Sequence, residues 1–300
     1  MSEEKSFPKT SINWYPGHMV KTKKILEEKA DLIDVVYELV DARIPVSSKI
    51  DNASSILKNK PRILIMTKAD LADPNDTIKW QKYYETKGYN VVSLANTKDD
   101  IKKLVNITNQ CMQEKLAKKK NKGNNSDLIH VAIIGIPNVG KSTLINRLAN
   151  NKSAKVGNLP GVTKSLTWLK TKSNIVILDT PGILWPKLEQ DEIALNLASM
   201  SAIKEEIIPT SKVACHILTK LAKYYPEVLK MRYNLDILDD YDIAYQTIAK
   251  KTGALMRGGE VDYKRVSTTI INDIKLEKIK GITFDKVEEY EVEAQNEIAN

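Results

Sequence analysis

The sequence has few cysteines and lacks both long apolar runs and a signal peptide. It has two cysteines in 300 residues, Cys111 and Cys215, and their separation fits neither a metal motif nor a redox motif, so we expect buried thiols in a reducing compartment. It has no apolar run near the roughly 20 residues that span a bilayer, and its first residues lack the apolar core of a signal peptide. These absences favour a soluble, cytoplasmic protein without a membrane partner.

Acidic residues are absent from one long stretch of the chain. Between Leu128 and Leu178 there is no Asp or Glu, whereas seven residues are Lys or Arg. Residues 1–189 carry 31 basic against 19 acidic residues, and residues 190–300 carry 15 against 19. A basic surface of this size attracts polyanions, although part of it can serve nucleotide phosphates alone.

The hydrophobic pattern divides the chain into two parts. Up to residue 189, β-branched apolar runs alternate with helical patterns, which predicts a mostly parallel sheet with helices on both faces. From residue 190 to 284 the apolar spacing is helical, which predicts a second, smaller, all-helical domain. The other expected segments are an N-terminal arm (1–24), a solvated basic linker (115–127) and a loosely held acidic tail (285–300).

The most specific motif lies at residues 135–142, which read GIPNVGKS and match the phosphate-binding loop G-x-x-x-x-G-K-[ST] in full. A predicted strand precedes this loop and a predicted helix follows it, as the motif requires. Its glycines let the backbone N–H groups approach the phosphates. We expect Lys141 to reach the β- and γ-phosphates and the Ser142 hydroxyl to bind Mg²⁺.

Two further sequence segments are typical of loops that sense the γ-phosphate. DTPG follows a predicted strand, where Asp179 can hold the Mg²⁺ shell and the Gly182 N–H can meet the γ-phosphate. Between the two motifs lies PGVT, whose Thr163 is the candidate for a switch hydroxyl that ligates Mg²⁺ when the γ-phosphate is present. An ordinary loop threonine is the alternative for Thr163.

A base-recognition motif, TKAD, follows the predicted strand PRILIM. A carboxylate at Asp70 can accept two hydrogen bonds from guanine, whereas adenine lacks that pair of donors, so an ATPase is disfavoured. The stem of Lys68 can lie over the base. Thr67 replaces the commoner Asn, and the segment SLAN, with Ala95 and Asn96, is the candidate for a loop that closes over the base.

The order of these motifs is unusual. The base motif comes first, and the phosphate loop, the switch threonine and DTPG follow, which is the usual order of a GTPase cut and rejoined. Circular permutation is tolerated because chain termini often lie close together at a domain surface. The linker at residues 115–127 is the expected new join. The segment after DTPG leads directly into the helical domain, so that nucleotide state can be passed on through a short connection.

Several phrases together closely resemble the ribosome biogenesis GTPase A family of circularly permuted GTPases. They are NWYPGHM (13–19), YELVDARIP (37–45), GIPNVGKSTLINRL (135–148) and LDTPGILWPK (178–187), and GALMRGGEVDY (253–263) resembles the C-terminal domain of that family. The resemblance covers nearly the whole chain. It implies a GTPase that acts in late assembly of the large ribosomal subunit, with a helical domain that contacts ribosomal RNA. Thr67, the SLAN loop and the acidic tail depart from the family pattern.

The resemblance also implies how the attacking water is positioned. Ile183 follows DTPG where Ras-like enzymes place a water-orienting Gln, and isoleucine cannot do that work. The family places a candidate in the N-terminal phrase, which here is His18; packing beside Pro16 and Gly17, or a contact with RNA, is the alternative. In related potassium-stimulated GTPases an asparagine at the position of Asn138 helps to hold K⁺, whose charge acts on the transition state.

The sequence thus predicts a circularly permuted P-loop GTPase domain, followed by a smaller all-helical domain, in a monomer. The predicted GTP-binding residues are Thr67, Lys68, Asp70, Ala95, Asn96, Asn138, Val139, Gly140, Lys141, Ser142, Thr143 and Gly182. Catalytic roles are predicted for His18, Lys141, Thr163 and Gly182, Mg²⁺ coordination for Ser142, Thr163 and Asp179, and K⁺ coordination for Asn138. The alternatives are an RNA-binding scaffold that uses GTP as a structural ligand with negligible turnover, and a membrane- or transport-linked GTPase.

Overall fold

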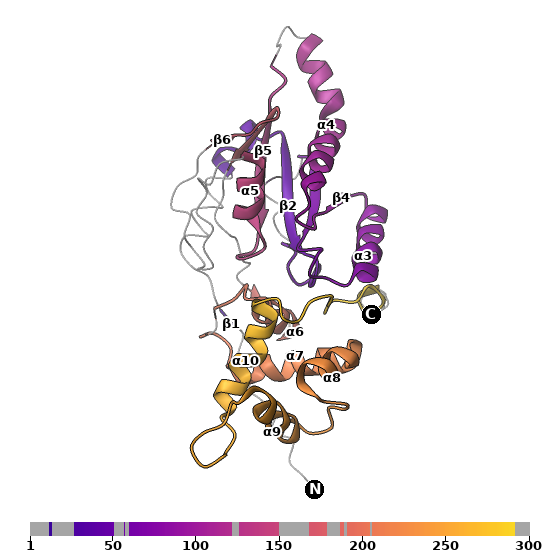
Figure 1. Cartoon of the computed structure of the whole chain (residues 1–300). Helices are drawn as coiled ribbons and strands as arrows, with labels where there is room; N and C mark the ends of the chain where they lie inside the picture. Colours follow the sequence, from indigo (N-terminus) through magenta and orange to yellow (C-terminus); the bar gives the residue numbers. More distant parts are fainter. Residues whose placement is uncertain are drawn as a thin grey trace.

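A computed structural model describes residues 12–13, 27–50, 57, 60–121, 126–149, 168–178, 187–188, 191–204 and 206–291. A sheet with flanking helices forms one region, and a cluster of helices lies against the lower end of that sheet (Figure 1). In this part of the chain no helix is both long enough and apolar enough to cross a membrane.

The main sheet has six strands in the order β4-β3-β2-β5-β7-β6. Neighbouring strands are parallel except β6, which runs antiparallel to β7. The strands are β2 (Val35–Asp41), β3 (Arg62–Thr67), β4 (Asn90–Ser93), β5 (Ile129–Gly135), β6 (Trp168–Lys170) and β7 (Ile175–Leu178). A separate antiparallel pair is formed by β1 (Ile12–Asn13) and β8 (Lys187–Leu188). The mostly parallel sheet that the sequence predicts is confirmed.

Both faces of this sheet are covered. β2 is buried at all seven of its positions, as expected for a strand packed on two sides. Leu39 and Val40, near its end, enter two different hydrophobic clusters, because successive side chains of a strand point to opposite faces. Val40 packs in the cluster that contains Trp80, whereas Leu39 packs in the cluster that contains Leu104.

The helices of the sheet region are α3 (Pro74–Thr86), α4 (Lys98–Asn121) and α5 (Lys141–Ala149). α4 continues further than the sequence pattern indicates, so the first seven residues of the linker predicted at 115–127 are helical. Lys and Ala form helix readily, and here that propensity outweighs the polar composition that suggested a linker. Lys115 also pairs with the residue that precedes β2, since its ammonium lies 2.8 Å from the carboxylate of the buried Asp34.

The helical region follows the sheet region along the chain. Its helices are α6 (Asp191–Ser199), α7 (Thr210–Tyr224), α8 (Pro226–Tyr233), α9 (Tyr241–Thr252) and α10 (Tyr263–Lys275). A single stretch of helical spacing in the sequence forms both α7 and α8, because Pro226 disfavours helical geometry at Tyr225 and starts a new helix. The predicted all-helical composition of this region is confirmed for its described residues.

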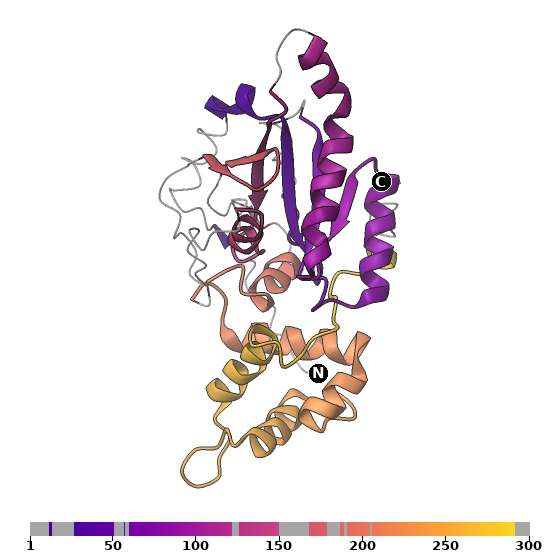
Figure 2. The same ribbon diagram turned by 45° about the horizontal axis from the view of Figure 1, so that its top comes forward.

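The prediction that the acidic segment from Asp285 is loosely held is wrong for residues 285–291. The Asp285 carboxylate accepts hydrogen bonds from the backbone N–H groups of Val46 and Ser47, both at 2.8 Å. The Tyr290 ring lies 5.9 Å from that of Trp80. In both views this last described segment runs from the helical region back to α3 (Figure 1, Figure 2). These three partners, Val46, Ser47 and Trp80, lie more than 200 positions earlier in the chain, so local composition could not reveal them.

Candidate nucleotide-binding site

The phosphate-loop sequence forms the turn between β5 and α5. At Gly135 a Cβ atom would lie 2.9 Å from Cγ1 of Val139 and 3.0 Å from the carbonyl oxygen of Leu39, so the close packing requires glycine. Gly140 has φ +105°, a conformation that other residues rarely adopt. α5 begins directly after the turn, at Lys141. Backbone N–H groups at a helix N-terminus after such a loop make an anion-binding site.

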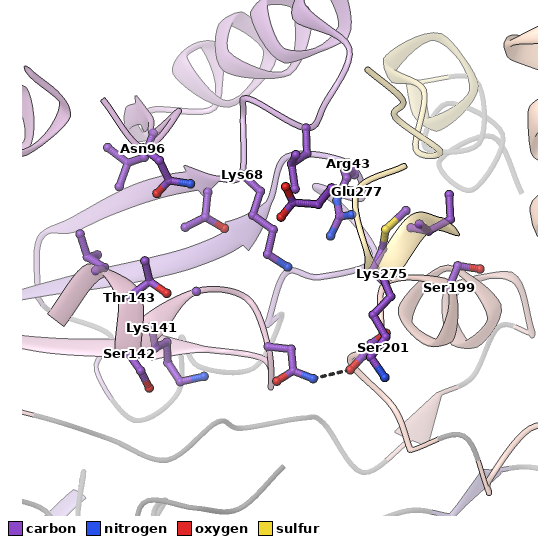
Figure 3. A pocket seen from close by; sticks show the side chains of 18 of the residues that line it. Arg43, Lys68, Asn96, Lys141, Ser142, Thr143, Ser199, Ser201, Lys275 and Glu277 are labelled. Atoms are coloured by element: carbon purple, nitrogen blue, oxygen red, sulfur yellow. Dashed lines mark hydrogen bonds between the residues drawn. The ribbon is translucent and has the colours of Figure 1, made fainter. Parts of the chain in front are cut away.

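The first residues of α5 carry the polar side chains expected beside phosphates. Lys141 is 8% exposed, and its ammonium donates to the carbonyl oxygens of Ile136 at 2.7 Å and Gly135 at 3.1 Å. Figure 3 shows Lys141, Ser142 and Thr143 together along one side of a pocket. The Ser142 hydroxyl is therefore placed where it can supply an oxygen ligand to a hard cation.

This pocket is a cavity of about 660 Å³ between the sheet region and the helical region. Its volume lies in the range of small-molecule and cofactor sites. Its walls come from the phosphate loop with α5, from the turns after β3 and β4, and from the helical region. The predicted GTP-binding residues that line it are Thr67, Lys68, Asn96, Asn138, Gly140, Lys141, Ser142 and Thr143.

Thr67 joins the base motif to the phosphate loop. Its hydroxyl oxygen lies 2.6 Å from the carbonyl oxygen of Val139 and 3.0 Å from that of Val40. The hydroxyl thus donates at the point where β2, β3 and the phosphate loop meet. Replacement of the commoner Asn by Thr keeps a hydrogen-bond donor against the loop, so this departure does not disconnect the base motif from the phosphate site.

Lys68 is held by a buried ion pair. It has φ 56°, and its ammonium donates to Oδ2 of Asp41 at 2.8 Å. Arg43 binds the same carboxylate through Nε at 2.9 Å and Nη2 at 2.8 Å. Burial alone would raise the pKa of Asp41, but the charges of Arg43 and Lys68 hold that pKa well below its usual range. Burial lowers the pKa of Lys68, and the Asp41 charge opposes this shift.

The turns after β3 and β4 contact each other and α5. Asp70 is exposed, and one of its carboxylate oxygens accepts a hydrogen bond from the Asn96 amide at 3.4 Å. Arg147 of α5 donates to the amide oxygen of Asn96 at 3.3 Å and also to the carbonyl of Thr97. Ala95 is half-buried in the same turn. The structure therefore brings the TKAD and SLAN segments together beside the helix that carries the phosphate-loop lysine.

Asn138 links the phosphate loop to the helical region. Its φ is 58°, and its side-chain nitrogen donates to the carbonyl oxygen of Ser201 at 2.6 Å (Figure 3). Ser201 lies in the turn after α6 and has φ 59°. This hydrogen bond uses the amide nitrogen of Asn138, whereas a K⁺ ion would coordinate the amide oxygen.

The end of α10 supplies another wall of the cavity. Lys275 and Glu277 both line it, and Figure 3 shows Glu277 beside Lys68 and Arg43 and Lys275 beside Ser201. The helical region is therefore in position to touch a bound nucleotide directly. Glu277 has φ 59°, an uncommon conformation for a residue other than glycine.

Four predicted site residues lie outside the described residues. They are His18, Thr163, Asp179 and Gly182. The predicted contacts of these residues with the γ-phosphate, Mg²⁺ or water therefore stay predictions.

The sequence patterns assigned no role to Asp41, Arg43, Ser201 or Glu277. A weak signal exists for the first two, because an acid ends an almost wholly apolar strand and a base lies two residues later. Ser201 and Glu277 have no local signal, since they reach the cavity from the helical region through folding alone.

Comparisons with known proteins agree with this geometry. A family model described as "50S ribosome-binding GTPase" matches residues 130–245, a span that starts in β5 and leaves out β2 to β4. Ribosome biogenesis GTPase A of Bacillus licheniformis is 44% identical over 280 residues, which cover 93% of this chain and 99% of that protein. The protein of the same name from Bacillus pumilus is 45% identical over 282 residues, with 93% and 99% covered.

Solved structures show the same fold. The GNP-bound YlqF from T. maritima has a TM-score of 0.63 and 22% identity, and the match covers 89% of this chain and 98% of that one. The GDP-bound structure of the same protein also gives a TM-score of 0.63. With the strand order described above, this likeness confirms the predicted circularly permuted GTPase fold.

Proposed function

Because the chain belongs to the ribosome biogenesis GTPase A family, and so is a GTP-hydrolysing enzyme of ribosome assembly, we propose that it is a switch that binds a late precursor of the large ribosomal subunit and leaves it after hydrolysis. The position of the cavity supports this proposal most. Its walls belong both to the nucleotide motifs and to the helical region, so a change in the bound nucleotide acts directly on that region.

Each described side chain of the site has its own role in binding GTP. Lys141 and the backbone of Gly140 hold the β- and γ-phosphates, and Thr143 continues that wall. Ser142 contributes a hydroxyl oxygen to Mg²⁺, which when bound neutralises charge on the phosphates. Asp70 reads guanine, while Lys68 lies over the base and Asn96 closes the site with Ala95. Since Thr67 anchors the base motif on Val139, the two parts of the nucleotide are held in a fixed relation.

Four residues outside the described part of the chain complete the proposed machinery. Thr163 and Asp179 ligate Mg²⁺ with Ser142, and the Gly182 N–H contacts the γ-phosphate. His18 orients the attacking water, because Ile183 has no group that can do so. We propose K⁺ at the amide oxygen of Asn138, where a positive charge stabilises the transition state.

The proposed partner surface is ribosomal RNA. The acid-free stretch between Leu128 and Leu178 favours phosphate contacts, and on the helical region Lys264, Arg265 and Lys280 are exposed. Each phosphate that is neutralised releases counterions, so binding should weaken steeply with salt. We propose that the protein acts as a cytoplasmic monomer.

Sedimentation with purified large-subunit precursor particles tests this proposal. The protein is incubated with particles in the presence of a non-hydrolysable GTP analogue, GDP, or the matching ATP analogue, each at two salt concentrations. We expect strong co-sedimentation with the GTP analogue, weaker co-sedimentation with GDP, and no increase with the ATP analogue over nucleotide-free protein. Equal particle binding with the GTP analogue and with GDP would contradict a nucleotide switch.

A further inference from the structure

Lys68 is surrounded by more polar contacts than its contact with a base requires. We propose that Asp41 and Arg43 position Lys68 over the guanine base, and that the segment leaving the helical region, residues 281–284, holds this pair in place. The inference rests on the assignment of Lys68 and Asp70 to the base in the proposed function. Asp41 and Arg43 are positioning residues, because they act on the nucleotide through Lys68.

Asp41 is placed for this task by the sheet. It ends β2, pairs in register with Thr67 of β3, and is 1% exposed. Its carboxylate has three side-chain contacts, with Lys68 Nζ, Arg43 Nε and Arg43 Nη2, at 2.8 to 2.9 Å. The backbone N–H of Arg43 adds a fourth at 3.1 Å. A buried carboxylate needs such partners, and with all of them it has one orientation.

The consequence for Lys68 is a fixed side chain. Its ammonium is tied to Asp41, while its residue lines the cavity that also contains the phosphate loop. A lysine stem that is already immobilised loses less rotamer freedom when a base stacks on it. The tether also keeps the ammonium away from the carboxylate of Asp70, which must stay available to guanine.

Arg43 in turn is held by the chain that leaves the helical region. The backbone N–H of Phe284 donates to the carbonyl oxygen of Arg43 at 2.7 Å. The Thr283 hydroxyl lies 3.4 Å from the carbonyl oxygen of Ala42 and accepts a hydrogen bond from the N–H of Asp73 at 3.2 Å. Residues 281–284 therefore bridge the turn after β2 and the turn after β3, which contains the base motif.

The bridge is anchored on both regions. The N–H of Gly281 donates to the carbonyl oxygen of Leu71 at 2.8 Å, one residue after Asp70. Phe284 is fully buried and its ring contacts His216 of α7. Displacement of the helical region would pull on residues 281–284 and so loosen Arg43. Docking of the helical region therefore sets the affinity for the base through residues 281–284.

Binding of two ligands separates this role from a general structural one. Affinities are measured for a fluorescent GDP, and for Mg²⁺–tripolyphosphate, which has no base, by competition. For Asp41→Asn we expect about tenfold weaker GDP binding, unchanged tripolyphosphate binding, and a KM for GTP that rises more than kcat falls. A parallel loss of affinity for both ligands would show that the pair merely supports the whole site and would overturn the inference.

Further variants keep the test decisive if Asp41→Asn folds poorly. Lys68→Met keeps an apolar stem but removes the tether to Asp41, and we expect it to weaken GDP binding to a similar extent. Combined with Asp41→Asn it should add little, because the two changes break one interaction. Full additivity of the two losses, or wild-type GDP affinity in Lys68→Met, would contradict a positioning role.

The bridge has its own variant and control. Thr283→Val removes the hydroxyl that contacts Ala42 and Asp73, and we expect two- to fivefold weaker GDP binding with unchanged tripolyphosphate binding. Thr268→Val removes a hydroxyl on the exposed side of α10 and should leave both affinities unchanged. Wild-type GDP affinity in Thr283→Val would remove the helical region from the inference.

If the proposed function is wrong, the GDP affinities of the variants show a different pattern. If Lys68→Ala and Asp70→Asn both bind GDP as wild type does, the base assignment itself is wrong. If these two variants bind weakly while Asp41→Asn binds normally, the base assignment stands and the positioning pair is rejected.

Discussion

The phosphate half and the base half of the cavity are built in different ways. The phosphate half is one turn, residues 135–142, whose shape depends on glycines and on backbone N–H groups. The base half is assembled from the turns after β2, β3 and β4 and from residues 281–284. A site within one turn tolerates distant change, whereas a site assembled from four segments depends on everything that holds those segments together. We therefore expect single mutations to affect either phosphate binding or base binding.

The largest effect is expected in the phosphate half, at Lys141. Lys141→Ala removes the charge that meets the β- and γ-phosphates, and kcat/KM for GTP should fall by about 10²–10³-fold. Phosphate release measures this, and Lys172→Ala is a matched control, because Lys172 is an exposed lysine of the same acid-free stretch. A Lys141→Ala enzyme with near wild-type turnover would mean that the cavity does not hold the phosphates as proposed.

In the base half, Asp70→Asn should cost about 1–3 kcal/mol of GTP binding, since an amide cannot accept both guanine donors. Affinity for xanthosine triphosphate should rise, because its donor and acceptor pattern is reversed at the atoms that Asp70 reads. Titration with both nucleotides measures the exchange of preference. Asp99→Asn, an exposed acid in the first turn of α4, should change neither affinity. Unchanged GTP affinity in Asp70→Asn would sink the assignment.

A smaller effect is expected at Asn138, where the phosphate loop touches the helical region. GTP hydrolysis should be several-fold faster in KCl than in NaCl at equal ionic strength, and Asn138→Ala should remove that difference, since the charge near the transition state is lost. Ser201→Ala serves as control, because it keeps the carbonyl that Asn138 contacts. Equal wild-type rates in the two salts would argue against a bound K⁺.

The smallest effect is expected from pH, through the anchor of the base half. Nε2 of His216 lies 2.7 Å from the Asn196 amide oxygen, and the Asn196 nitrogen donates to Asp285 at 2.9 Å. Burial lowers the pKa of His216 to about 4 in the folded protein, from an ordinary value near 6.5. The folded state resists protonation, so this contribution to stability is present above pH 6.5 and is lost as the pH falls from 6.5 towards 4.

Thermal unfolding between pH 7.5 and 4.5 measures this effect. The loss of Tm on acidification should be a few degrees smaller in His216→Gln than in the wild type, because glutamine has no proton to take up in the unfolded chain. An identical acid response of the wild type and His216→Gln would remove His216 from this account.

The sequence predicts the phosphate half well for a physical reason. The contacts that define it, such as that of Gly135 with Val139, span a few residues, so a local motif contains them. The sheet and the helical region follow equally from apolar periodicity, which depends on neighbours in the chain. The TKAD motif was also found locally, and the hydroxyl of Thr67 explains how a departure from the commoner Asn is accommodated.

The rest could not be predicted because the contacts are distant in sequence. Asp41 needs Lys68, 27 positions later, and the turn that holds Arg43 needs Phe284. The segment from Asp285 looks like a solvated acidic tail, yet Asp285 binds Ser47, 238 positions earlier. At the end of α4 the prediction was wrong for a local reason. The lysine-rich composition suggested a linker, but lysine has a good helix propensity and the segment is helical up to Asn121.

The bridge formed by residues 281–284 has a consequence for synthesis of the protein on the translating ribosome. The phosphate loop emerges first, and the segment that completes the base half emerges only after the helices of the helical region. Domains of a nascent chain form from the N-terminus onward as translation proceeds. We expect the growing polypeptide to bind phosphates before its affinity for guanine reaches the final value, which requires the helical region to be translated and docked.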